Sequence, residues 1–265
     1  MKHPLVCITL RGETAEQVSR DALSAKDLGA DLVEVRIDML WLREERVPIE
    51  KENDDNYGDR NEFSITQNFL DFEDVDIKTD LETISASIDV PLIFTCRSRD
   101  QGGVFPGDES QRTEVLKEAI SLNPQWVDLE VSINPGIREE ITSIIGKETK
   151  IIASIHSNEK TPPPSEIVQD VLDNQELGDI VKACYITKNR TDGLRIFEAA
   201  WELKDSEIDS TLMGLGPGGD WSRIHAPLLG QFMVYSTTES GWHLAQQGRI
   251  NASDLKTAWG LLGYA

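Results

Sequence analysis

The stretch Asp179-Ile180-Val181-Lys182-Ala183-Cys184-Tyr185 decides the fold, because it is a short, mostly apolar run of the length and composition of a buried β-strand. Seven similar runs occur elsewhere, and longer amphipathic patterns separate them. The eight runs span residues 5–10, 32–38, 91–97, 126–131, 150–156, 179–185, 210–216 and 232–237. Helical patterns span residues 14–28, 109–122, 137–145, 165–175, 192–204 and 253–262, the last with Ser253 as its expected N-cap.

Eight strands, each followed by a helical segment, predict an α/β protein with a (β/α)8 TIM barrel as a single domain over residues 1–265. A doubly wound sheet would carry a glycine-rich phosphate loop after the first strand. Arg11-Gly12-Glu13-Thr14 stands there instead and lacks that pattern. Residues 43–75 form an acidic insertion, which we expect to be an exposed excursion that becomes helical only from Phe69 onward.

Composition excludes several classes of partner. The chain of 265 residues has 47 acidic and 26 basic residues and a formal net charge of -21, which disfavours nucleic acid and anionic membranes as partners. No apolar stretch approaches the ~20 residues that span a bilayer, and no signal peptide is recognisable. Cys7, Cys96 and Cys184 lie in separate strand-like runs, as expected of small core residues in a reducing compartment. We therefore expect a cytoplasmic protein.

Polar side chains occur in strands where a barrel should be dry. Alternate residues of a barrel strand point inward, and those near its carboxyl end line the mouth where active sites lie. Pairs such as Arg36 with Asp38, or Arg97 with Glu130, have an equally good structural interpretation as ion pairs that cap the barrel. The inward polar residues are Glu34, Arg36, Asp38, Arg97, Asp128, Glu130, His156 and Lys182.

Lys182 has the weakest structural explanation. A buried ammonium is costly, burial lowers the pKa of a lysine, and a neutral amine attacks carbonyl groups. His156 is the only one of the four histidines at a predicted strand end of the mouth. This pair favours imine chemistry. The lysine would form an imine with a ketone, and the histidine would move a proton from the neighbouring carbon.

The seventh strand leads into Gly214-Leu215-Gly216-Pro217-Gly218-Gly219, which is a weak phosphate-loop signal without fixed spacing. Arg223 follows it and is a candidate clamp for an anionic group, since a guanidinium grips a carboxylate through two hydrogen bonds.

Five segments, taken in order, resemble type I 3-dehydroquinate dehydratase over nearly the whole chain. They are Asp31 to Asp38, Phe94 to Ser98, Ile152 to His156, Asp179 to Lys182, and Ser222-Arg223. The resemblance implies a lyase of the shikimate pathway, which supplies chorismate for aromatic amino acid biosynthesis. It would convert 3-dehydroquinate to 3-dehydroshikimate by syn elimination, without metal or organic cofactor, and members are commonly homodimers.

The resemblance also implies roles for individual residues. Lys182 would form the imine (Schiff base) and His156 would transfer the proton, whereas the anionic small-molecule substrate would be bound by other side chains. The substrate-binding residues would be Thr9, Glu34, Arg36, Arg97, Arg223 and Gln246.

Two positions depart from the family pattern. Gln101 stands four residues after Arg97, where the family often has a glutamate, so the pH dependence of His156 is expected to differ. The last loop reads Ala245-Gln246-Gln247-Gly248-Arg249 in place of Ala-Pro-Gly-Gln, so Gln246, Gln247 or Arg249 would contact the substrate carboxylate. A class I aldolase-like barrel and a catalytically silent metabolite-binding barrel remain as alternatives.

Overall fold

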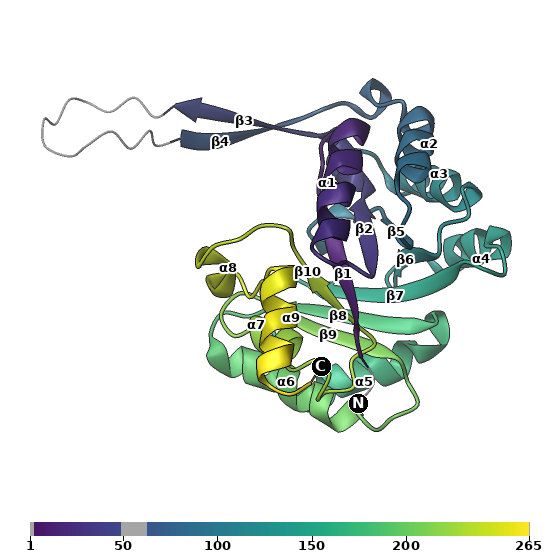
Figure 1. The fold of residues 1–265 in the computed structure, drawn as a ribbon. Coiled ribbons are helices and arrows are strands. Elements are labelled where there is room, and N and C mark those ends of the chain that lie inside the picture. Colours follow the sequence, from purple (N-terminus) through teal and green to yellow (C-terminus); the bar gives the residue numbers. More distant parts are fainter. Residues whose placement is uncertain (1–2, 49–62, 265) are drawn as a thin grey trace, which may run out of the picture.

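The computed structural model describes residues 3–48 and 63–264. Eight parallel strands form a nearly closed barrel in the order β10-β1-β2-β5-β6-β7-β8-β9, and helices surround it (Figure 1). The TIM-barrel prediction is confirmed. The strands are β1 Leu5–Leu10, β2 Leu32–Arg36, β5 Leu92–Thr95, β6 Trp126–Glu130, β7 Lys150–Ser157, β8 Ile180–Ile186, β9 Ser210–Leu215 and β10 Met233–Ser236.

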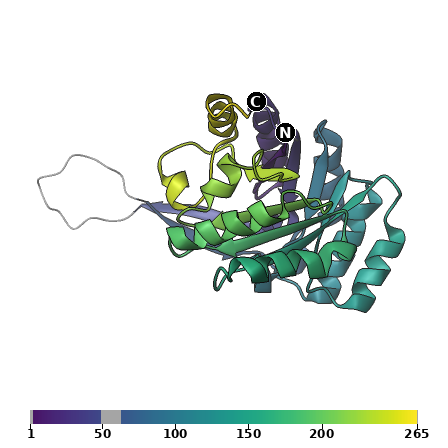
Figure 2. The same ribbon diagram turned by 90° about the horizontal axis from the view of Figure 1, so that it is seen from below.

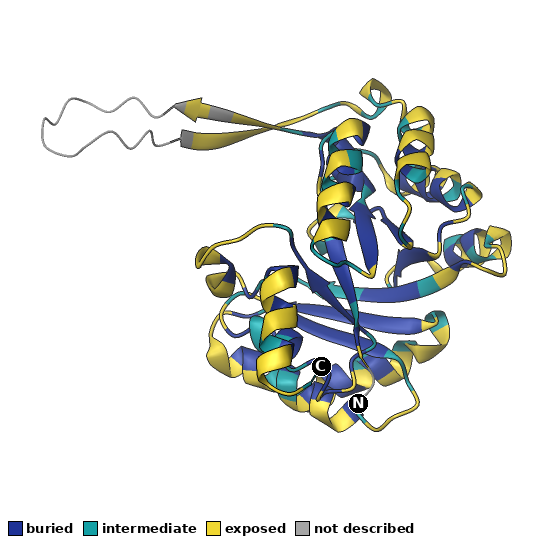
Figure 3. Cartoon of the chain, viewed as in Figure 1, coloured by how far each residue is buried: buried dark blue, intermediate teal, exposed yellow. Residues whose placement is uncertain are grey.

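The helices cover the outside of the barrel. Seen from below, they lie outside the strands (Figure 2). The sides of the helices that face the sheet are buried, whereas their outer sides are exposed (Figure 3). They are α1 Ala15–Asp27, α2 Ile77–Ser87, α3 Glu109–Ser121, α4 Pro135–Ile144, α5 Pro164–Asn174, α6 Arg190–Leu203, α7 Asp220–Ile224, α8 His243–Gln246 and α9 Ala252–Leu261, with 3-10 turns η1 Ile37–Trp41, η2 Phe72–Asp74, η3 Arg99–Gln101 and η4 Gln175–Leu177. Val33 and Val35 of β2 share a core cluster with Ala22 and Ala25 of α1. The apolar alternation of the strands therefore packs outward against helices and turns their polar residues inward.

The start of the last helix differs from the prediction. Asn251, not Ser253, is the N-cap of α9, and its side chain accepts a hydrogen bond from the Ser253 backbone N–H. Both residue types satisfy the free N–H groups at a helix start, so the sequence alone did not separate them.

The insertion after β2 contains a β-hairpin that the sequence analysis did not predict. β3 (Leu42–Pro48) pairs antiparallel with β4 (Phe63–Phe69), and the hairpin points away from the barrel (Figure 1). The helix expected from Phe69 begins only at Ile77, where Asp76 caps α2. The alternation of apolar and polar residues over Ser64-Ile65-Thr66 was the missed strand signal. The acidic run at residues 50–56 lies outside the described residues.

Two strands close the barrel without a regular ladder. Phe232 N donates to Ser210 O at 2.9 Å, Thr211 Oγ1 donates to Met233 O at 3.1 Å, and Leu212 N donates to Gln231 Oε1 at 2.5 Å. This seam between β9 and β10 is therefore held partly by side chains.

Cys7, Cys96 and Cys184 are buried free thiols, as predicted, and burial raises the pKa of each. Within the described part of the chain, no helix combines the length and hydropathy needed to cross a bilayer.

Candidate active site

Four inward side chains from alternate strands form one layer across the barrel. They are Glu34 of β2, Asp128 of β6, Lys182 of β8 and Tyr235 of β10, which are the second, fourth, sixth and eighth strands around the barrel. Lys182 Nζ lies 2.9 Å from Glu34 Oε1, 3.1 Å from Asp128 Oδ2 and 4.0 Å from the centroid of the Tyr235 ring. In this fold, layers of four side chains from alternate strands usually fill the barrel with apolar residues. Here three of the four are charged residue types.

Lys182 is buried, as predicted, but it is not an isolated amine. The two carboxylates beside Nζ compensate the loss of hydration that burial alone would impose on an ammonium. The pairing was not predicted, because it depends on residues from three strands that are far apart in the sequence.

The carboxylates themselves are held as anions by their neighbours. Burial raises the pKa of Glu34, but the positive charges of Lys182, Arg36 and Arg97 together outweigh it, so the net pKa is lowered. Asp128 behaves in the same way, since Arg97 and Lys182 hold its pKa below the ordinary range despite burial. Glu34 also accepts hydrogen bonds from Thr9 Oγ1 at 2.8 Å and Thr95 Oγ1 at 3.0 Å. Both anions are therefore fixed in place.

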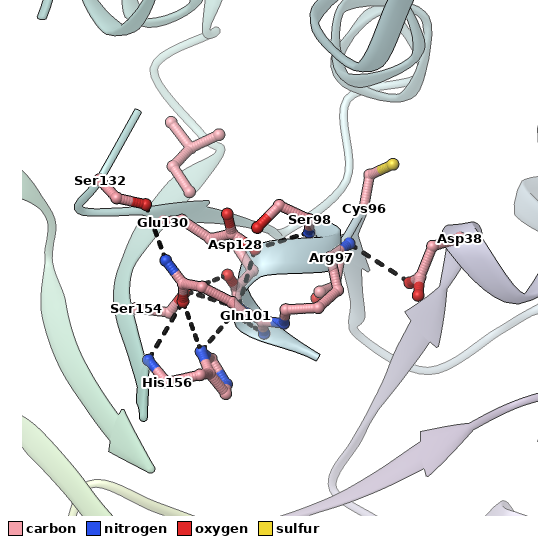
Figure 4. A network of polar contacts seen from close by, with 12 residues as sticks. Asp38, Cys96, Arg97, Ser98, Gln101, Asp128, Glu130, Ser132, Ser154 and His156 are labelled. Carbon is pink, nitrogen blue, oxygen red and sulfur yellow. Dashed lines mark hydrogen bonds and ion pairs between the residues drawn. The ribbon is translucent and has the colours of Figure 1, made fainter. Parts of the chain in front are cut away.

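His156 and Arg97 lie next to this layer, at the carboxyl ends of β7 and β5. Arg97 Nη1 is 2.7 Å from His156 Nδ1, and the same guanidinium contacts Asp128 Oδ2 at 3.3 Å and Glu130 Oε1 at 3.4 Å (Figure 4). Because arginine can only donate, Nδ1 accepts in this contact and carries no proton.

Gln101 provides the other partner of the histidine. Its Oε1 accepts from the His156 backbone N–H at 3.1 Å and lies 3.1 Å from Nδ1, while its Nε2 donates to Ser132 Oγ at 2.8 Å (Figure 4). These contacts fix which end of the amide faces the ring. Nδ1 therefore has two alternative partners: Arg97 when it is unprotonated and Gln101 when it carries the proton.

The electrostatic setting keeps His156 neutral. Burial, followed by the positive charges of Arg97 and Lys182, lowers the pKa of the imidazole well below its ordinary value. A neutral imidazole at physiological pH is able to accept a proton, as a general base must.

A cavity of about 210 Å³ opens above this layer at the carboxyl ends of the strands. Seven of the eight predicted site residues line it, and Gln246 does not. The seven are Thr9, Glu34, Arg36, Arg97, His156, Lys182 and Arg223. Within residues 3–48 and 63–264, no group of three or more His, Cys, Asp or Glu side chains is arranged to hold a metal ion.

Comparison with known proteins places this site in a family. The family model described as type I 3-dehydroquinase matches residues 6–264. The chain belongs to the type I 3-dehydroquinase family. A 3-dehydroquinate dehydratase from Methanopyrus kandleri is 26% identical over 260 residues, which cover 98% of this chain and 100% of that protein. Family membership identifies the activity as that of a hydro-lyase.

Other relatives agree. A 3-dehydroquinate dehydratase from Methanothermobacter thermautotrophicus is 27% identical over 236 residues, covering 89% of this chain and 88% of that protein. The crystal structure of a type I dehydratase from Clostridium difficile superposes with a TM-score of 0.78 at 24% identity, covering 99% of this chain and 93% of that one. That likeness supports the fold.

Arg36 has a structural partner in addition to its place in the dehydratase cavity. Its Nε and Nη2 bind Asp38 Oδ1 and Oδ2 at 2.8 and 2.7 Å. Asp38 also accepts from the backbone N–H groups of Arg97 and Val104 at 3.3 and 3.1 Å. The Arg36–Asp38 and Arg97–Glu130 pairs considered at the sequence level both exist, and each arginine lines the cavity as well.

Arg223 is buried behind the glycine-rich loop of the dehydratase. Its Nε donates to Tyr235 O at 2.9 Å, and its Nη1 donates to Gly214, Gly219 and Gly248 O, each at 2.7 Å. These four bonds join β9, β10, the start of α7 and the last loop. They use only Nε and Nη1. Arg223 therefore links these backbone segments, which we call the Arg223 brace, and also lines the cavity.

The last loop separates the three candidates for the carboxylate contact. Gln246 and Gln247 are exposed, whereas Arg249 is half-buried and lines the cavity. Arg249 Nη2 lies 2.9 Å from Glu239 Oε1 and 3.0 Å from Thr237 Oγ1. Gln247 instead accepts from Arg249 Nη1 at 3.3 Å.

Arg11 and Tyr235 are among the cavity residues that the sequence did not predict. Arg11 follows β1 directly, so its position at a strand end was a usable signal. Burial and the charges of Arg36 and Arg249 lower its pKa. All three arginines line the cavity. The alternation of β10 predicts that Tyr235 points inward. An inward tyrosine looks like an ordinary core residue in the sequence, so it was not singled out.

Proposed function

We propose that this hydro-lyase dehydrates 3-dehydroquinate through an imine on Lys182, with His156 as the proton-transfer group. The observation that carries the proposal is the position of Lys182 Nζ, which lines a cavity between two fixed carboxylates while a neutral histidine lines the same cavity.

Imine formation requires Nζ to release a proton, and Glu34 Oε1 at 2.9 Å is the neighbouring acceptor. The neutral amine attacks the C3 ketone, and the resulting carbinolamine loses its oxygen as water. The product of this step is an iminium, which is a cation like the ammonium it replaces. Glu34 and Asp128 therefore stabilise the iminium in the same place, without reorganisation.

Elimination follows from the electron-withdrawing iminium. His156 takes a proton from C2, and the electron pair moves into the C3–N system as an enamine. The enamine returns its electrons as the C1 hydroxyl departs, and the protonated His156 gives that oxygen a proton, so that water leaves. Hydrolysis of the product imine regenerates Lys182, and the net change is the loss of one water.

The arginines account for recognition of an anion by an acidic protein. Arg36 and Arg97, with Glu34 and Thr9, would position the ring hydroxyls. Arg223 would bind the carboxylate through the part of its guanidinium that the brace does not use, and Arg249 would assist from the last loop. A local group of cations in a cavity attracts an anion even where the net charge is -21.

Borohydride trapping tests the proposal. The protein is incubated with 3-dehydroquinate and borohydride, and the modified peptide is identified by mass spectrometry, while the conjugated product is followed by absorbance without borohydride. We expect the adduct on Lys182 and turnover in the untreated sample. Lys150→Ala is the matched control, because Lys150 is exposed above Trp126 and outside the cavity, and it should keep both signals.

The other outcomes favour the alternatives. An adduct on Lys182 without conjugated product would favour an aldolase-like reaction. Neither adduct nor turnover would favour a silent metabolite-binding barrel and contradict the proposal.

We also propose that the enzyme works in the cytoplasm as a homodimer, as the family resemblance implies. The three buried free thiols are consistent with a reducing compartment. Light scattering coupled to size-exclusion chromatography tests the oligomeric state, and a mass near twice 29.6 kDa is expected.

A further inference from the structure

The hydroxyl of Tyr235 is buried in the active site without a hydrogen-bond partner. Among the described residues, four buried side-chain polar atoms lack one: Glu130 Oε2, Arg138 Nε, Thr187 Oγ1 and Tyr235 Oη. Of these four residues, only Tyr235 lines the cavity that holds Lys182 and His156. An unpaired buried hydroxyl destabilises the folded state, and a phenylalanine would fill nearly the same volume without that cost.

Tyr235 also lies directly against the reacting amine. Lys182 Nζ is 4.0 Å from the centroid of its ring, as in a cation–π contact, and the two residues belong to the same layer of the barrel. The Tyr235 carbonyl is held by Arg223 Nε at 2.9 Å, which fixes the backbone of β10 at this point. The ring is therefore placed beside any group bonded to Nζ, and it carries the unpaired hydroxyl.

The barrel order separates Tyr235 from His156. β7, which carries His156, neighbours β8 on one side, whereas β10 lies on the other side beyond β9. The two residues therefore stand on strands on opposite sides of the strand that carries Lys182. A group on the Tyr235 side is suited to a step other than the C2 proton transfer.

We propose that Tyr235 Oη donates a hydrogen bond to the oxygen on the carbon that Lys182 attacks, first the substrate ketone oxygen and then the carbinolamine hydroxyl. This inference rests on the proposed imine chemistry and adds a catalytic residue to its first half. The hydrogen bond draws electrons toward oxygen while Nζ adds to carbon, and it holds that oxygen as the C–O bond breaks.

The proton count closes without a net transfer from the phenol. Nζ begins as an ammonium and gives one proton to Glu34, and a second moves from nitrogen to oxygen as the carbinolamine forms. The oxygen then takes the proton from Glu34 and leaves as water with the electron pair of the C–O bond, and the nitrogen lone pair forms the iminium. Burial, followed by Glu34, raises the pKa of Tyr235, so the phenol stays neutral and remains a donor.

Tyr235→Phe tests the inference, because it keeps the ring face under Nζ and removes only the hydroxyl. In rapid-quench experiments the variant and 3-dehydroquinate are mixed, borohydride is added after set times, and the Lys182 adduct is quantified by intact mass. We expect the rate of adduct formation to fall by about 10-fold or more, as for loss of one donor to a developing negative charge. The variant should also unfold at a higher urea concentration in the absence of substrate.

A substrate deuterated at C2 gives a second readout. If imine formation becomes slower in Tyr235→Phe, the isotope effect on kcat should decrease toward 1, because C–H cleavage then limits the rate less. A residue with a merely structural role would not change this ratio.

Thr187→Val is the matched control, since it removes another buried, unpartnered hydroxyl outside the cavity. It should raise stability in the same way and leave the rate of adduct formation unchanged. Wild-type rates of adduct formation in Tyr235→Phe would overturn this inference and leave the proposed function standing. Failure of the wild-type protein to form any adduct would overturn the proposed function instead.

Discussion

The layer around Lys182 and the last loop, residues 245–249, both contribute to the cavity, but their side chains are held in place differently. Glu34, Asp128, Lys182 and Tyr235 stand on strands whose register fixes them, and the two carboxylates are ion-paired to Lys182. In the last loop, only Arg249 lines the cavity, and its guanidinium is bound to the half-exposed Glu239.

This difference teaches where sequence reasoning about a barrel enzyme works. A strand has a side-chain period of two, so the direction of a residue follows from its position in the run. A loop has no such period, and its side chains are placed by particular contacts. We therefore expect substitutions in the layer to affect catalysis and substitutions in the loop to affect substrate binding.

The largest effect is expected at the centre of the layer. Lys182→Met should remove the borohydride adduct and reduce turnover by at least about 10,000-fold, because the nucleophile is lost. It also leaves Glu34 and Asp128 without their shared cation, which should lower the free energy of unfolding at neutral pH by about 3–5 kcal/mol. Turnover and urea unfolding measure the two effects, and a variant with normal stability would show that the ion pairs are weak.

His156→Ala should separate the two halves of the reaction. We expect turnover to fall by about 100- to 10,000-fold, which is the usual contribution of a general acid–base group, while the Lys182 adduct still forms. Trapping and steady-state kinetics on the same sample check this. Unchanged turnover would assign the proton transfer to another residue.

The last loop should show a smaller effect, on binding rather than on chemistry. Arg249→Met should raise KM by about 10- to 100-fold with little change in kcat, as expected for the loss of a charge-assisted hydrogen bond of about 1.5–3 kcal/mol. Gln246→Ala is the matched comparison and should leave KM unchanged, since Gln246 is exposed outside the cavity. The reverse result would favour Gln246 among the three residues, Gln246, Gln247 and Arg249, that the family resemblance left open for the carboxylate contact.

The smallest effect concerns pH. The pKa of His156 is lowered by burial and by Arg97 and Lys182, so its neutral, basic form persists below the ordinary histidine range. We therefore expect kcat/KM to fall on the acid side only below about pH 6.5. Gln101→Glu places a carboxylate beside Nδ1, which favours the protonated ring. The acid side of the pH profile of kcat/KM should therefore move to higher pH by roughly one unit. A wild-type limb at or above pH 6.5 would contradict the assignment.

The sequence was sufficient for the barrel and for placing most of the candidate residues at the cavity, because both depend on strand period. Lys182 and His156 were found because a charged or titratable residue in an apolar strand is costly unless the structure compensates it. The hairpin of β3 and β4 was missed because its strands pair only with each other, and short alternation was outweighed by charge. Tyr235 was missed because an orphaned hydroxyl is defined by its surroundings, which the sequence does not contain.

The brace formed by Arg223 links the seam of the barrel to ligand binding. One guanidinium holds β9, β10 and the last loop together and also faces the cavity. An anion that bound Arg223 only in the folded chain would stabilise the folded state by mass action. At a ligand concentration 100 times Kd, this linkage is worth about 2.7 kcal/mol to the folded state. We therefore expect bound substrate to stabilise the barrel against unfolding.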